Sequence, residues 1–131
     1  MSAFLALALL TGAEDKKDKD VVIIEITKQK KYVKKGDDAQ KDVEVTVGQS
    51  VRWVNKHDET HTATCKLKGK DDKPLFDTGD LDEGKSSKDV VFDQKTYEAA
   101  GGKDGKPVTL PYYCVYHASM KSNIILKPKK E

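Results

Sequence analysis

Short segments with the pattern of β-strands, separated by turn residues, constrain the fold of this chain most strongly. Val43, Val45 and Val47 alternate with polar residues, which is the period of a strand with one buried face. The run 21–27 is dense in β-branched residues and predicts a first strand. Further strands are expected at 50–55, 61–67, 90–92, 110–115 and 123–127. This pattern predicts an all-β domain built as a sandwich or a barrel.

Two stretches between these segments have no clear strand pattern. Residues 28–41 are polar, with a turn at 36–38. Residues 97–109 contain three glycines and a proline, so we expect an irregular loop there, with one helical turn at 97–100.

The N-terminal residues are predicted to be a targeting segment. Residues 2–10 are apolar but too few to span a bilayer, and small residues follow at 11–13. We interpret 1–13 as a signal peptide remnant, 14–20 as a charged linker and 21–131 as the folded domain. The protein is therefore expected to be periplasmic or otherwise exported.

The charge pattern argues against a nucleic-acid partner. Basic and acidic residues nearly cancel, at 24 against 22, and Arg52 is the only arginine. Base readout and phosphate binding depend heavily on arginine forks. The lysines are interpreted as a solvated surface.

The run from Cys114 to Met120 carries the chemistry of the chain. It has the spacing Cys-x2-His-x2-Met, with the histidine at His117, and a further histidine, His61, follows a strand-like segment upstream. Two imidazoles, a thiolate and a weak axial thioether form the ligand set of a blue-copper electron-transfer site. The sequence predicts that these four residues bind one copper ion.

The remaining histidine and cysteine are given structural roles. His57 lies in a polar loop and is interpreted as a surface residue. His57 and His61 have the i, i+4 spacing that binds zinc on a helix, but residues 53–62 have the pattern of a strand and a loop, so a zinc site there is disfavoured. Cys65 is expected to be a buried, inert thiol. A disulfide between Cys65 and Cys114 is the alternative, and it would destroy the metal site.

Three segments, in order along the chain, resemble the small blue-copper proteins of the cupredoxin family, the group of plastocyanin, amicyanin and pseudoazurin. They are Trp-Val-Asn-Lys-His-Asp-Glu-Thr-His-Thr at 53–62, Leu-Phe-Asp-Thr-Gly at 75–79 with Glu-Gly at 83–84, and Tyr-Tyr-Cys at 112–114 with the ligand loop. The resemblance runs over 21–127. It implies a Greek-key β-sandwich with one type 1 copper.

The resemblance also implies roles for single residues. His61, Cys114 and His117 would be equatorial ligands and Met120 the axial ligand, and the backbone N–H of Thr62 would bond the cysteine sulfur. His117 would lie near the surface, in an uncharged docking patch rimmed by lysines at 56 and 121 that steer an acidic partner. The segment between 97 and 112 is longer than in minimal members, and could cover part of the site or serve a specific partner.

The function implied is a soluble carrier that moves single electrons between larger redox proteins. It would not be an enzyme, and a monomer is the default expectation. A periplasmic copper-delivery protein is one alternative, although Met1 and Met120 are the only methionines. A mononuclear copper enzyme with a modified site is the other alternative, and it would need an exchangeable ligand position.

Overall fold

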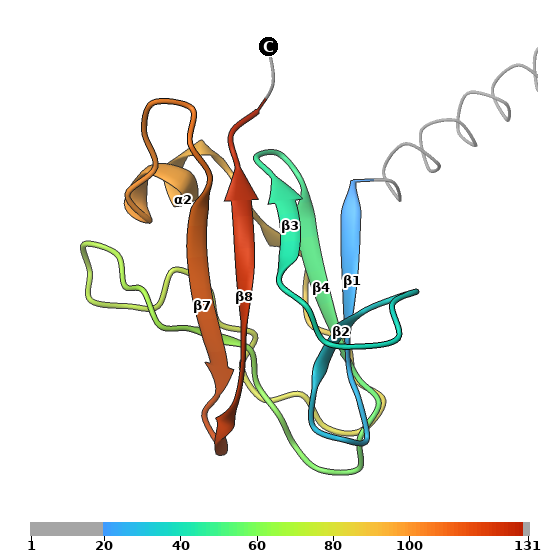
Figure 1. Cartoon of the computed structure of the whole chain (residues 1–131). Helices are drawn as coiled ribbons and strands as arrows, with labels where there is room; N and C mark the ends of the chain where they lie inside the picture. The colour runs from blue at the N-terminus through green and yellow to red at the C-terminus, as the bar shows by residue number, and fades with distance from the viewer. Residues whose placement is uncertain (1–19, 130–131) are drawn as a thin grey trace, which may run out of the picture.

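In this computed structural model, which describes residues 20–129, two four-stranded sheets lie face to face (Figure 1). The first sheet has the strand order β2 (Tyr32–Lys34), β1 (Val21–Ile26), β4 (Ser50–Asn55), β6 (Val90–Val91). The second has the order β3 (Val43–Thr46), β8 (His117–Lys127), β7 (Val108–Cys114), β5 (Thr64–Cys65). One short helix, α2 (Gln94–Ala99), precedes β7. The predicted all-β sandwich is confirmed.

Both sheets are mixed. β1 pairs in parallel with β4, and β3 pairs in parallel with β8, while the other pairings are antiparallel. Parallel neighbours cannot be joined by a hairpin, so the chain must cross between the sheets to make these pairs. These crossings bring the loop after β4 and the turn after β7 to the same end of the sandwich.

Three predicted elements differ in detail. The segment 28–41 was expected to be loop, but it contains the short strand β2. The strand expected at 61–67 is reduced to β5, and His61 instead forms an isolated bridge with Leu81. The helical turn expected at 97–100 is the longer helix α2, because the Asp93 side chain accepts a hydrogen bond from the backbone N–H of Thr96 and caps it.

Aromatic rings fill the space between the sheets next to the predicted ligands. Trp53 is fully buried and stacks on Phe76 with ring centres 5.3 Å apart. Tyr112 meets the Trp53 ring edge-on at 5.4 Å. Each such ring buries roughly 150–250 Å² and is stiff. Because β4 carries Trp53 and β7 carries Tyr112, this contact fixes the strands that lead to Asn55 and Cys114.

The segment of α2 and the loop after it lies far from the predicted ligands. In Figure 1 this segment is at the upper end of the sandwich, while β7 runs down to its turn with β8 at the lower end. The seven residues of β7 span about 20 Å at 3.3 Å per residue. The idea that residues 97–111 cover part of the site is therefore wrong.

The predicted signal peptide at 1–13 and nearly all of the linker at 14–20 lie outside the described residues. Within 20–129, no helix has the length and apolar character needed to cross a bilayer.

Candidate metal centre

A tight turn between β7 and β8 explains the spacing of the first two predicted ligands. Cys114 pairs directly with His117, so only two residues, 115–116, form the turn. Residues directly opposite each other on antiparallel strands point to the same face, with Cβ atoms about 4.5–5.5 Å apart. The Cys-x2-His spacing is therefore the spacing that a two-residue hairpin requires to place thiolate and imidazole side by side.

A shift in strand register accounts for the position of Met120. Tyr113 pairs with Lys121, whereas Cys114 pairs with His117, so residues 118–120 form an irregular bulge on β8. Bulges bend a strand and redirect its side chains. Here Met120 is returned to the interior and is only 4% exposed. The structure thus buries Met120 at the same end of the sandwich as Cys114, and its role as a ligand stays a prediction.

His61 reaches the site from the other side of the core. Its backbone exchanges two hydrogen bonds with Leu81, at 3.1 and 2.8 Å, which holds the residue outside any regular strand. The whole residue is buried. Burial and the neighbouring imidazoles of His117 and His57 lower the pKa of His61. A neutral imidazole has a free ring nitrogen, so His61 is in the state that a metal ligand needs.

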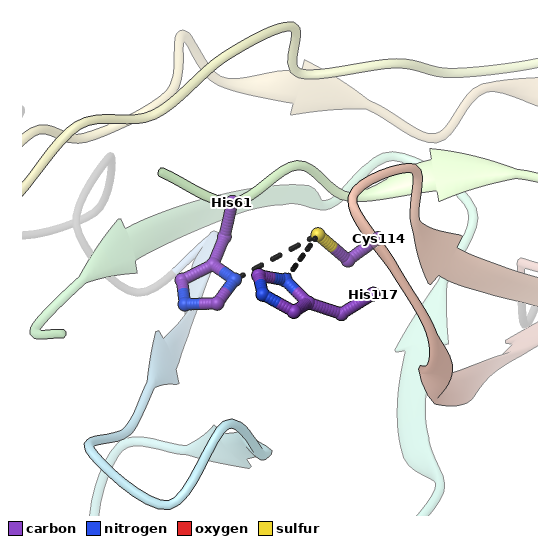
Figure 2. A group of neighbouring side chains, drawn as sticks. All are labelled: His61, Cys114 and His117. Carbon is purple, nitrogen blue, oxygen red and sulfur yellow. Dashed lines mark hydrogen bonds between the residues drawn. The ribbon is translucent and has the colours of Figure 1, made fainter. Parts of the chain in front are cut away.

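These three side chains meet at the sulfur atom (Figure 2). Cys114 Sγ lies 3.7 Å from His61 Nδ1 and 3.6 Å from His117 Nδ1. An ion bound at about 2.3 Å by sulfur and about 2.0 Å by nitrogen would separate the two donors by about 3.7 Å in a trigonal set and about 3.5 Å in a tetrahedral one. The observed distances therefore fit one shared ion, and a Cys-His-His set with a buried thioether nearby suits copper.

The cysteine sulfur also accepts the backbone contact that the resemblance implied. Thr62 N–H points to Cys114 Sγ at 3.4 Å. The Thr62 hydroxyl accepts a hydrogen bond from Val115 N–H at 3.1 Å, and the buried Tyr32 hydroxyl donates to the Thr62 carbonyl. Contacts from β2, from the end of β7 and from the turn that follows it thus fix the Thr62 backbone that faces the sulfur. Such contacts around a ligand orient it and tune the metal.

His57 is not the free surface residue that the sequence suggested. Its side chain is only 12% exposed, and its Nδ1 lies 2.9 Å from His61 Nε2. The two rings stack with centres 5.1 Å apart. Sequence reasoning placed His57 in a polar loop, and that loop folds back over the ligand. His57 therefore contacts the outer edge of a predicted ligand.

Glu59 is a residue that sequence reasoning missed. Its carboxylate lies 3.0 Å from His117 Nε2 and 3.5 Å from Lys30 Nζ. Partial desolvation alone would raise the pKa of Glu59, but the charges of Lys30 and of the nearby imidazoles outweigh it, and the pKa is lowered. The carboxylate is thus ionised at neutral pH and can accept a hydrogen bond from the His117 imidazole. The signal available in the sequence was only its place two residues before His61.

Asn55 holds the loop that carries these contacts. Its fully buried side chain donates to the carbonyls of Glu59 and Leu81, both at 2.7 Å, and accepts from His57 N–H at 2.9 Å. The amide thereby ties the loop to the segment that pairs with His61. Asn55 was part of the family pattern in the sequence, but its role is visible only in the fold.

Both cysteines are free thiols, so the Cys65–Cys114 disulfide is contradicted. Cys65 lies on β5, is 1% exposed and pairs with Tyr112. Burial raises the pKa of the Cys65 thiol, which keeps it protonated and unreactive. The expectation of a buried, inert Cys65 therefore agrees with the structure.

Two carboxylates contact the ligand loop, and the rim of lysines that the resemblance implied stays a prediction. The hydroxyl of Tyr116 donates to both oxygens of Asp80, at 2.8 and 2.9 Å, and Glu59 contacts His117. Lys56 instead lies 4.0 Å from Glu25. Asp80 could not be placed at this end from the sequence, because the backbone bridge between His61 and Leu81, the residue after Asp80, brings it there.

Comparison with solved structures identifies the fold. A Cu(I) form of an amicyanin variant superposes with a TM-score of 0.60 at 15% identity, over 83% of this chain and 84% of that chain. An oxidized amicyanin variant gives 0.59 at 16% identity over the same shares. A copper-containing nitrite reductase from Thermus scotoductus SA-01 gives 0.57 at 22% identity, over 83% of this chain but 23% of that chain. No protein-family model and no curated protein matches the sequence.

These likenesses establish that the chain has the cupredoxin fold, as its three sequence segments predicted. The fold places a cysteine, two histidines and a buried methionine at one end of the sandwich.

Proposed function

We propose that this protein is a type 1 copper electron carrier. His61, Cys114 and His117 are the equatorial ligands and Met120 is the axial ligand. The observation that carries the proposal is the convergence of two imidazole Nδ1 atoms on one buried sulfur, at 3.7 and 3.6 Å. The amicyanin structures support it, since they are Cu(I) and oxidized states of proteins with this fold.

The residues around the site favour electron transfer over other metal chemistry. Bound copper would supply a one-electron Cu(I)/Cu(II) couple. Cys114 and His61 are fully buried, and Thr62 N–H faces the sulfur, so the protein holds the donors and excludes water without help from the metal. A ligand cage that is fixed in advance changes little between oxidation states, which is what rapid electron transfer needs.

The edge of His117 is the proposed point of electron exit. Its side chain is 24% exposed, and the adjacent Val115 and Tyr116 are 48% and 54% exposed. Exposed apolar side chains next to a redox centre suit brief contact with a partner protein. The expected partners are therefore larger redox proteins that donate and accept electrons here, and the protein is expected to act as a monomer.

An enzymatic role is the competing interpretation, since the nitrite reductase has the same fold over 23% of its chain. Catalysis at the metal would need a ligand position open to substrate. The burial of Met120 favours a closed site instead. Export of the protein, by the predicted signal segment at 1–13, is part of the same proposal.

Spectroscopy of the copper-loaded full chain tests the proposal. Cu(II) should give an intense blue band and narrow copper hyperfine splitting, and both should vanish in Cys114→Ser. Cys65→Ser is the matched control, because it also removes one buried thiol but should leave the spectrum unchanged. A colourless wild-type protein would refute the type 1 site.

Reversible voltammetry and ligand exchange then separate the functions. A carrier should exchange one electron rapidly and reversibly, and its spectrum should not respond to azide or nitrite. A spectrum that shifts on addition of nitrite would favour the enzyme, and a protein that binds only Cu(I) would favour copper delivery.

A further inference from the structure

We propose that the loop 56–60 is a hydrogen-bond clamp on both ligand histidines. In this clamp, His57 accepts the Nε2–H of His61 and Glu59 accepts the Nε2–H of His117. The two contacts fix each imidazole in the tautomer that leaves Nδ1 free for the metal, and they lower the reduction potential. The inference about the potential rests on the proposed copper function.

The contact of His57 with His61 has the geometry of a directed hydrogen bond. The two nitrogens are 2.9 Å apart, and the His57 side chain is mostly buried. His61 presents Nδ1 to the Cys114 sulfur, so its proton must be on Nε2 when Nδ1 is a ligand. His57 Nδ1 must then be the acceptor.

That assignment is consistent with the rest of the loop. If His57 accepts at Nδ1, its own proton is on Nε2, and this atom lies 3.3 Å from Asp58 Oδ1. A carboxylate, an imidazole and the ligand imidazole thus form one chain in which every donor meets an acceptor. A reversed assignment would leave His57 Nε2 as an acceptor facing a carboxylate.

Glu59 makes the corresponding contact with the second ligand. Its Oε1 is 3.0 Å from His117 Nε2, while His117 Nδ1 faces the sulfur. Lys30 lies 3.5 Å from the same oxygen and holds the carboxylate in place. Both ligand histidines therefore have an acceptor on the outer nitrogen, and both acceptors come from one loop.

The loop is held rigidly enough to act in this way. The buried Asn55 amide binds His57 N–H at 2.9 Å and the Glu59 carbonyl at 2.7 Å, so it fixes the backbone of both acceptors. Its third bond, to the Leu81 carbonyl at 2.7 Å, ties the loop to the segment that pairs with His61. The acceptors and the ligand are therefore fixed relative to one another.

An acceptor on the outer nitrogen makes an imidazole a stronger donor, and this favours Cu(II) over Cu(I). Loss of such a partner typically costs 10–100-fold in metal affinity. If the loss falls on Cu(II) alone, the potential rises by about 60–120 mV, at 59 mV per tenfold change for one electron. His57 and Glu59 are positioning residues in this scheme, since neither touches the metal.

A second metal ion is the competing interpretation of the same residues. Donor atoms of His57, Glu59 and His61 lie within 4.8 Å of one another. An ion bound there would need the Nε2 proton of His61 to leave. The short distance between the two imidazole nitrogens favours the hydrogen bond, because two nitrogens bound to one ion at about 2.0 Å would stand about 3.3 Å apart.

The first experiment uses metal-free protein and needs no copper chemistry. Nitrogen-15 NMR of the histidine rings should show a slowly exchanging Nε2–H on His61 in the wild type. His57→Ala should lose this protection, whereas His57→Asn should keep it, because the asparagine oxygen can stand where Nδ1 stood. Equal protection in wild type and His57→Ala, or a His61 protonated on Nδ1 alone, would overturn the clamp.

The second experiment measures potentials of the copper-loaded full chain. His57→Ala and Glu59→Ala should raise the potential, with His57→Asn closer to wild type. Glu98→Ala on α2, at the far end of the sandwich, is the control with the same change of residue, and it should stay near the wild-type value. Unchanged potentials in His57→Ala and Glu59→Ala, beside a blue wild type, would overturn the clamp and leave the proposed function intact.

Titration with Zn²⁺ completes the test. One equivalent bound per chain, in wild type and in His57→Ala, is the expected result. A second equivalent that disappears in His57→Ala would overturn the clamp in favour of a second metal site. A wild-type protein with no blue spectrum would refute the proposed function, while the NMR measurement on metal-free protein would still test the hydrogen bonds of the clamp.

Discussion

Replacement of Asn55 by alanine should destabilise the metal-free protein more than any other change of a polar side chain discussed above. The buried amide makes three hydrogen bonds, to the backbone of His57, Glu59 and Leu81. Alanine would leave all three backbone groups without this partner. The effect is expected in the folding equilibrium, since no metal is involved.

The size of the effect follows from the surroundings of each partner. The Leu81 carbonyl is buried at this contact, so removing its hydrogen-bond donor should lower the free energy of unfolding by about 1–3 kcal/mol. The groups on His57 and Glu59 are partly buried and can regain water, which limits the cost to about 0.5–1.5 kcal/mol each. The total is about 2–6 kcal/mol, equivalent to a fall of roughly 7–22 °C in Tm for a chain of this size.

Urea and thermal unfolding in the presence of a chelator would measure this difference. The matched control is Asn123→Ala, because Asn123 makes one exposed hydrogen bond, to Asp42 at 3.1 Å. The control should change the free energy of unfolding by less than about 0.5 kcal/mol. If Asn55→Ala lies within about 1 kcal/mol of the control, the loop is not held by the amide and the reasoning fails.

Three further changes test other parts of the structure. Tyr32→Phe removes the buried donor to the Thr62 carbonyl and should cost about 1–3 kcal/mol, measured by urea unfolding; no change would mean that another donor replaces it. Gly102→Ala should lower the free energy of unfolding by about 1–3 kcal/mol, since an added Cβ would lie 2.5 Å from the Tyr97 ring. An unchanged Tm would show that the loop can move away from the ring without strain. Asp93→Ala should cost about 1 kcal/mol at pH 7. The hydrogen bond from the backbone N–H of Thr96 lowers the pKa of Asp93 in the folded state. The stability that Asp93 contributes is therefore present above its unfolded-state pKa and is lost as pH falls through its folded-state pKa. A difference in stability between wild type and Asp93→Ala that does not close in acid would contradict this.

The parts of the fold that sequence could predict are those with a strong local period. Val43 and Val45 alternate with exposed residues, and they lie in β3 with their side chains buried. The strand β2 was missed because it has three residues in a lysine-rich segment, and only Tyr32 is fully buried. The strand at 61–67 was overestimated, because residues 61–65 are all buried and therefore do not show the one-sided burial that alternation predicts.

The candidate ligands were predictable for a different reason, which is residue type and spacing. Cys114 and His117 had to be close because a two-residue turn joins them. His61 was predicted from its residue type and its place after a strand-like segment, but no local spacing fixes its position, since it lies 53 positions before Cys114 and the fold brings the two together.

The contacts on the outer nitrogens were missed because no pattern marks a hydrogen-bond acceptor. A ligand histidine that binds through Nδ1 must still place its Nε2–H against an acceptor when that edge is buried. For His61, which is fully buried, solvent cannot serve, so a protein acceptor is required. In the proposed clamp the acceptors, His57 and Glu59, lie four and two residues before His61, and Asn55 precedes them at the end of β4. The first proposed ligand, both proposed acceptors and Asn55 thus lie within seven consecutive residues, 55–61. The outer contacts of the candidate site are therefore encoded locally, even though the site itself is assembled by the fold.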